Sequence, residues 1–261
     1  MRLPFFDSAE QGGQSAQNAQ DASVGVRRVS ALEGHALWAA TYDNDPNPLL
    51  ALEEREIESL LPDLRETFVL DVACGTGRWL ARLVRRGARR GAGLDLSAEM
   101  LRRAKEKPAI RRLILQADCL SLPIRERVSD LIVFSFAVGY VSELPGLASE
   151  LARVSCPGAE IFLTDFHPTG HLRGWKRAFR YEGETIEISS VAHSIEQIVD
   201  AFKAGGFRLL NVHSPCLSES EKWIFEGRRK SHLYEAARKT PAIFICHFQK
   251  SPDSREGRVA S

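Results

Sequence analysis

The strongest constraint on the fold is an alternation of short apolar segments and helical segments that begins near residue 68. Helical segments between them carry apolar residues at helical spacing, as Leu144, Leu147 and Leu151 do. Strands separated by helices of this length predict an α/β fold with a doubly wound sheet, parallel through most of its width. The apolar runs of strand length occupy residues 68–73, 92–96, 113–116, 131–136, 161–166, 207–212 and 242–248.

The length of 261 residues suits one such domain with modest insertions. Residues 10–23 consist mostly of Gln, Gly, Ala, Ser and Asn, which bury too little apolar surface to offset the entropy of ordering. We therefore expect a disordered tail over 1–30 and another over 251–261. The folded domain is expected to span 31–250, with insertions near 167–193 and 214–240.

The charge balance argues against a nucleic-acid partner. Lys and Arg number 35 against 34 Asp and Glu, a formal net charge of +1. Proteins that bind duplex nucleic acid usually carry a basic excess or stripe, so no DNA partner is expected. Local basic runs such as 85–90 and 228–230 are interpreted as solvated surface.

The five cysteines form no Cys-x-x-Cys pair and do not stand at zinc-ligand spacing with the histidines, so no metal site is expected. Their odd number is typical of reduced thiols in a cytoplasmic protein. No apolar run approaches the roughly 20 residues that span a bilayer, and the N-terminus lacks the apolar core of a signal peptide.

A glycine turn follows the first strand of the sheet, at Gly75 and Gly77. Glycines let the backbone turn tightly near a ligand, and the next helix offers free N–H groups. The dinucleotide fingerprint needs a small residue at 78 or 80, where Arg78 and Leu80 stand, which disfavours a nicotinamide dehydrogenase. Asp95 ends the second strand, 24 positions after Asp71. A carboxylate there can accept hydrogen bonds from both ribose hydroxyls, so the turn predicts a nucleoside cofactor.

Five successive motifs resemble those of class I methyltransferases, closest to the group that includes quinone and malonyl-carrier-protein methyltransferases. The resemblance covers roughly residues 42–166. It implies a Rossmann-like sheet of seven strands with an antiparallel last strand, S-adenosyl-L-methionine as cofactor, and methyl transfer to a small-molecule acceptor by in-line displacement. The motifs are VLDVACGTGRW, GLDLSAEML, QADCLSLP, SDLIVFSFAVGY and LARVSCPGAEIFLTDF.

The resemblance also implies the residues that hold the cofactor. Its methionine part is assigned to Asp71, Ala73, Cys74, Gly75 and Gly77; the ribose to Asp95; the adenosine to Leu96, Met100, Asp118, Cys119 and Leu120; the sulfonium surroundings to Phe134, Ser135 and Phe136; and the covering tyrosine to Tyr42.

The acceptor side is less constrained. His167 follows a strand at the carboxyl edge of the sheet, where open α/β sheets bind ligands, so His167 and Tyr140 are the catalytic candidates. Trp175, Arg177 and Arg180 are candidates for an aromatic and cationic face toward a substrate. The competing interpretation is a lid that packs its Trp inward and leaves its charges in water.

Two other functions remain open on the sequence. Nucleic-acid and protein methyltransferases that modify planar nitrogens tend to carry a Pro-Pro-aromatic tetrapeptide, and this chain has Ser135-Phe136-Ala137-Val138 at that position. A small-molecule acceptor is therefore preferred over RNA. A catalytically silent partner subunit that binds the cofactor is the second alternative. The sequence specifies neither the acceptor nor the oligomeric state.

Overall fold

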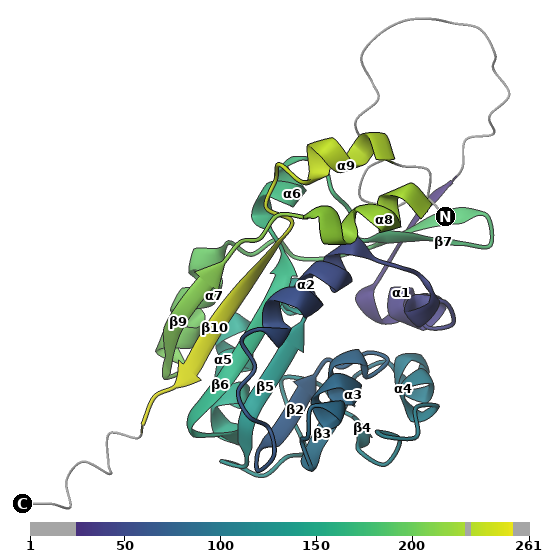
Figure 1. Cartoon of the computed structure of the whole chain (residues 1–261). Coiled ribbons are helices and arrows are strands. Elements are labelled where there is room, and N and C mark those ends of the chain that lie inside the picture. Colours follow the sequence, from purple (N-terminus) through teal and green to yellow (C-terminus); the bar gives the residue numbers. More distant parts are fainter. Residues whose placement is uncertain (1–24, 228–230, 253–261) are drawn as a thin grey trace, which may run out of the picture.

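A seven-stranded sheet forms the centre of the computed structural model, which describes residues 25–227 and 231–252 (Figure 1). The strand order is β4-β3-β2-β5-β6-β10-β9, and β10 runs antiparallel to both of its neighbours. The remaining pairs are parallel, which confirms the predicted fold class. The strands are β2 (Phe68–Val72), β3 (Arg90–Asp95), β4 (Ile114–Gln116), β5 (Ser129–Ser135), β6 (Ser155–Phe166), β9 (Phe207–His213) and β10 (Ile243–Lys250).

Helices cover both faces of this sheet because its central strands are apolar on both sides. One buried cluster joins the sheet to α2, α3, α4, α8 and α9, and the other joins it to α5 and α7. The helices of the two layers are α2 (Pro48–Glu58), α3 (Arg78–Arg85), α4 (Ala98–Lys105), α5 (Leu144–Val154), α7 (Ile195–Ala204), α8 (Glu219–Gly227) and α9 (Ser231–Ala237).

A second, three-stranded sheet was not expected. It has the order β1-β8-β7, with β1 at Val26–Val29, β7 at Ala178–Tyr181 and β8 at Glu184–Ile188. The prediction of a disordered tail to residue 30 is therefore wrong for 26–29, because β1 pairs in parallel with β8, far away in the sequence. Residues 1–24 and 253–261 of the predicted tails lie outside the described residues.

The small sheet carries the first helix, α1 (Ala31–Trp38), beside the main sheet (Figure 1). Trp38 of α1 stacks on Phe179 of β7 with ring centroids 4.9 Å apart. The short helix η1 (Tyr42–Asn44) then leads into α2. Together β1, α1, η1 and the β7–β8 hairpin form what we call the cap.

The two predicted insertions have distinct places. The first contains α6 (Pro168–Leu172) and the β7–β8 hairpin, and so contributes to the cap. The second contains α8 and α9, whose Phe225 and Tyr234 are buried in the cluster that includes α2. No described helix is long and apolar enough to cross a membrane.

Candidate cofactor and acceptor site

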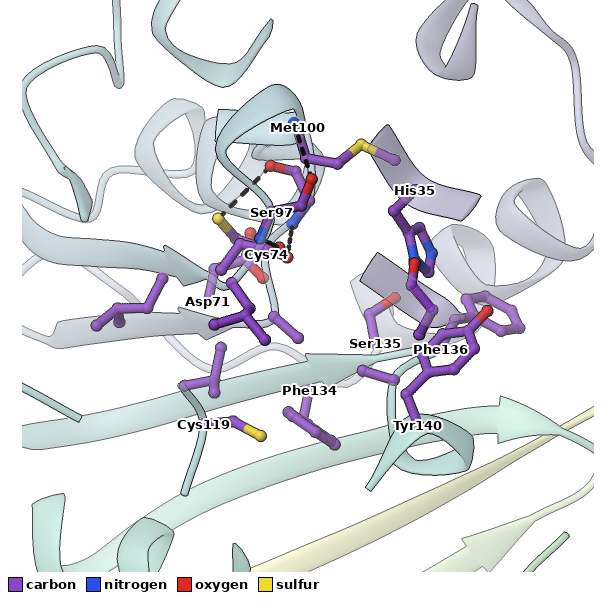
Figure 2. A pocket seen from close by; sticks show the side chains of 18 of the residues that line it. His35, Asp71, Cys74, Ser97, Met100, Cys119, Phe134, Ser135, Phe136 and Tyr140 are labelled. Atoms are coloured by element: carbon purple, nitrogen blue, oxygen red, sulfur yellow. Dashed lines mark hydrogen bonds between the residues drawn. The ribbon is translucent and has the colours of Figure 1, made fainter. Parts of the chain in front are cut away.

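A cavity of about 290 Å³ lies between the carboxyl ends of the parallel strands and the cap (Figure 2). It is lined by residues at or just after the ends of β2, β3, β4 and β5, and on the other side by residues of α1 and η1. Every residue assigned to the cofactor by resemblance lines this cavity except Gly77. The sequence motifs therefore converge on one place, although they are spread over almost a hundred residues.

The glycine turn has two glycines with different tasks. Both have left-handed backbones, with φ of +53° at Gly75 and +74° at Gly77. A Cβ on Gly77 would overlap the Ile110 side chain, whereas a Cβ on Gly75 would meet nothing within 4 Å. Gly77 thus allows close packing behind the turn, and Gly75 keeps the cavity side open.

Two further cavity residues share this backbone conformation without being glycine. Ala73 and Phe136 have φ of +57° and +52° and follow the adjacent strands β2 and β5. The left-handed region costs an L-residue about 1–2 kcal/mol. Local strain at two neighbouring strand ends is typical of a functional site.

Asp95 is fixed in orientation by the backbone around it. Its Oδ2 accepts a hydrogen bond from Gly75 N and its Oδ1 accepts one from Ser97 N, each at 2.8 Å. The N-cap of α4 is Ser97, whose hydroxyl accepts from Met100 N, so Asp95 is free of that task. Each carboxylate oxygen retains a lone pair, which suits a ribose diol.

Asp71 is buried beneath the turn, with 1% of its surface exposed. Its Oδ2 accepts from Leu80 N at 2.8 Å and so satisfies a donor in the first turn of α3. Burial raises the pKa of Asp71 to about 7, against the lowering effects of the Leu80 hydrogen bond and of Arg78. A cationic ligand group nearby would favour the ionised carboxylate.

The rim opposite the cap is apolar with one carboxylate. Asp118 Oδ1 accepts from Leu120 N at 2.9 Å. Burial raises the pKa of the neighbouring Cys119 thiol to about 12, so this thiol stays protonated and forms part of an apolar wall. Three carboxylates around apolar walls fit a cofactor that has a cationic amino-acid end, a ribose diol and a planar base.

The cap is tied to the glycine turn by Asp43. Asp43 Oδ1 accepts from the Thr76 hydroxyl at 2.6 Å, and Lys107 Nζ donates to Asp43 Oδ2 at 2.7 Å. Tyr42 beside it lines the cavity and packs edge-on against Trp38, and burial raises its pKa to about 12. Tyr42 and Asp43 therefore lie beside the glycine turn, on the cap side of the cavity.

Glu53 of α2 was missed by the sequence analysis. Its carboxylate is fully buried and accepts hydrogen bonds from Trp79 Nε1 at 3.0 Å and from the Ser135 hydroxyl at 2.7 Å. It also accepts from Arg78, a cavity residue, and from Thr164 on β6. Glu53 stands four positions after Leu49 and four before Ile57, on the apolar face of its helix. This spacing could have identified it from the sequence as a buried carboxylate.

The predicted catalytic residues separate in the structure. Tyr140, at the end of the short helix η2 (Val138–Tyr140), lines the cavity. His167 does not line it: His167 caps α6, and its Nδ1 accepts from Thr169 N at 3.2 Å. The position of His167 therefore gives no support for a catalytic role.

The predicted substrate-binding residues do not line the cavity either. Trp175 is buried against Gly170, and Arg180 is bound to Thr185 Oγ1 at 3.0 Å. Arg177 is buried, pairs with Asp165, and lies 4.7 Å from the centre of the Tyr140 ring. These side chains hold the cap and the wall of the cavity, and they do not form an open cationic face.

Comparison with known proteins agrees with this geometry. The methyltransferase domain family matches residues 69–158. A malonyl-[acyl-carrier protein] O-methyltransferase of Pectobacterium atrosepticum is 38% identical over 205 residues, which cover 74% of this chain and 78% of that protein. A bifunctional biotin biosynthesis protein of Cellvibrio japonicus is 31% identical over 68% of this chain, but the match spans only 35% of that protein.

Solved structures show the same fold. An S-adenosylmethionine-dependent methyltransferase from Mesorhizobium loti aligns with a TM-score of 0.61 at 20% identity, over 76% of this chain and 97% of that one. At this identity the likeness concerns the fold alone. The extended match to the Pectobacterium relative, the ordered motifs and the cavity that they line all agree. The chain therefore belongs to the class I S-adenosylmethionine-dependent methyltransferases.

Proposed function

We propose that this enzyme methylates a small-molecule acceptor that enters the aromatic end of the cavity. The observation that carries the proposal is the continuation of the cavity beyond β5. There Phe136, Tyr140 and His35 form one wall, opposite Asp71 and Cys119 (Figure 2). Tyr140 and His35 are not among the residues assigned to the cofactor.

The covering of the cavity supports a small acceptor. The cap closes over the glycine turn through Asp43, Thr76 and Lys107. Among the described lining residues, Arg78 is the single cation, and it is paired with Glu53 and Glu54. A nucleic-acid acceptor would require free cationic groups along its path, so this lining favours a small molecule over RNA.

The chemistry places modest demands on the protein. S-adenosylmethionine supplies an electrophilic methyl group on a sulfonium, from which the thioether is a good leaving group. The chain's own residues bind and orient the two reactants and exclude water, which accounts for much of the rate enhancement in such displacements. Asp95 orients the nucleoside through its backbone-fixed carboxylate, and the cap excludes water.

The proposal also places the enzyme in the cytoplasm. All five cysteines are free thiols, and Cys74 and Cys246 are buried among apolar side chains. Free thiols are typical of a reducing compartment.

The first experiment is calorimetric binding of S-adenosylmethionine and S-adenosylhomocysteine to the wild type and to Asp95→Ala. Loss of two charge-assisted hydrogen bonds at roughly 1.5 kcal/mol each predicts about 100-fold weaker binding. Asp63→Ala, whose carboxylate pairs with Arg65 outside the cavity, is the matched control. Equal affinities of the wild type and Asp95→Ala would contradict the cofactor assignment.

The second experiment uses S-adenosylmethionine with a tritium-labelled methyl group and a cell extract. The label is expected in the small-molecule fraction after filtration. Label that stays with RNA or with protein would contradict the proposed acceptor class. Tight cofactor binding without any transfer would instead indicate a silent partner subunit.

A further inference from the structure

His35 on α1 is the one histidine of the described chain that lines the cavity. Its ring lies edge-on to the Tyr140 ring, with centroids 5.0 Å apart and an interplanar angle of 88°. Both side chains lie on the same wall of the cavity (Figure 2). His35 therefore stands where an acceptor would be held.

The hydrogen bonds of His35 determine which ring nitrogen carries the proton. Nδ1 lies 2.8 Å from the carbonyl oxygen of Ala31, one helical turn earlier. A carbonyl oxygen only accepts, so Nδ1 must donate, and the lone pair of the neutral ring is on Nε2. Within residues 25–227 and 231–252, His35 Nε2 has no hydrogen-bond partner. It is also not one of the fully buried polar atoms that lack a partner, so it remains accessible.

We propose that His35 is the general base of the acceptor site and takes the proton of an acceptor hydroxyl through Nε2. The inference rests on the proposed function and deepens it. The oxygen–hydrogen bond breaks and its proton moves to Nε2. The oxygen electron pair forms the bond to the methyl carbon, and the electron pair of the broken carbon–sulfur bond stays on the sulfur.

The charged groups around His35 keep its ring in the basic form. Burial lowers the pKa of His35, the Ala31 hydrogen bond and Asp95 of β3 raise it, and Arg177, which precedes β7, lowers it. Tyr140 of η2 faces the ring as a neutral phenol, because burial raises the pKa of Tyr140. A neutral imidazole at pH 7 can accept a proton without first losing one.

The assignment narrows the acceptor class. A carboxylate acceptor is already ionised near neutral pH and would need no base. A hydroxyl keeps its proton near neutral pH, so a general base accelerates methyl transfer to it. The wall of Phe136, Tyr140 and His35 suits a flat ring, so the acceptor expected here is a hydroxylated planar molecule.

The first test reads the ring directly. Nitrogen NMR of the ¹⁵N-histidine-labelled full chain, bound to S-adenosylhomocysteine, is expected to show His35 with its proton on Nδ1. The pKa of His35 is expected below 6.5, its ordinary value. A neutral ring with its proton on Nε2 would overturn the proposal whatever the acceptor is.

The second test uses tritium-labelled methyl transfer into the small-molecule fraction. His35→Gln is expected to bind S-adenosylmethionine like the wild type and to transfer label about 100-fold more slowly, since general bases contribute about 10²–10⁴-fold. The wild-type rate should rise with pH and level off above the pKa of His35, and the variant should lack this inflection.

The control for the transfer experiment is a histidine far from the cavity. His232→Gln, on the exposed surface of α9, should match the wild type. A wild-type rate and pH profile in His35→Gln would overturn the role of His35. A wild type that binds the cofactor and labels nothing would defeat the proposed function, while the NMR result would still decide whether Nε2 is available.

Discussion

The two walls of the cavity are built in different ways. The wall that we propose for the cofactor, called the cofactor wall, consists of the turn after β2 and the end of β3, where backbone N–H groups hold Asp71 and Asp95 within about 25 residues of sequence. The cap wall depends on side chains that meet across long sequence separations, such as Asp43 with Thr76 and His35 with Tyr140. The first wall is a local property of a motif, and the second exists only in the folded chain.

The largest effect should come from Glu53 of α2, whose buried carboxylate joins α3, β5 and β6 behind the cofactor wall. Glu53→Ala leaves Arg78 and Trp79 Nε1 without their buried acceptor, and breaking a buried ion pair costs about 3–5 kcal/mol. Urea unfolding should show this loss in the free energy of unfolding. Glu54→Ala, which removes a half-buried partner of Arg78 and Arg82, should cost far less. Equal losses in the free energy of unfolding for the two variants would show that the buried bonds of Glu53 contribute no more than the half-buried pairs of Glu54.

The cofactor wall should respond to pH through Asp71. Its native pKa of about 7 lies above the unfolded value of roughly 3.9, so between these values the native state binds more protons than the unfolded state. The free energy of unfolding should therefore fall as pH rises from 4 to 7, by a few kcal/mol at about 1.36 kcal/mol per pKa unit.

Asp71→Asn tests this dependence. The amide oxygen can still accept from Leu80 N, but it does not titrate. Thermal unfolding in a pH series should show a flatter profile for the variant than for the wild type. Parallel profiles would show that Asp71 is ionised throughout this range. Other groups would then offset the effect of burial on its pKa.

The two glycines of the turn should separate stability from binding. Gly77→Ala combines left-handed strain with overlap of Ile110, so it should lower the free energy of unfolding by about 2 kcal/mol. Gly75→Ala carries strain without overlap, yet its methyl group enters the cavity side. It should weaken S-adenosylhomocysteine binding with a smaller loss of stability. The opposite pattern would reverse the tasks assigned to these glycines.

The sequence predicted the cofactor wall because its signals are local. The seven apolar runs all correspond to strands, and the residues assigned by resemblance line the cavity except Gly77, which packs behind it. Asp95 was identified by its distance from Asp71, a spacing that the strand–turn–helix geometry itself imposes.

The cap was predicted poorly because its signals are not local. β1 is a strand only because it pairs with β8, and a short segment such as VRRV has no clear alternation of its own. His35 could not be placed near Tyr140 without the packing of α1 against β7. Arg177, a candidate for substrate contact beside the lid interpretation, is buried and pairs with Asp165 on β6.

The smallest effect should come from the contact that Asp43 of the cap makes with the glycine turn. Asp43→Ala removes the exposed ion pair with Lys107, worth about 0.5–1 kcal/mol, and the hydrogen bond from the buried Thr76 hydroxyl. Because the Lys107 pair is screened by salt, the loss in S-adenosylmethionine affinity should shrink between low and high ionic strength. Calorimetry at two salt concentrations measures this, with Glu106→Ala, which removes the Arg103 pair, as the matched surface control.

If Asp43→Ala weakened binding as much as Asp95→Ala at every salt concentration, Tyr42 and Asp43 would belong to the cofactor wall itself. The cap would then be part of the binding motif and no longer a separate structure that covers it.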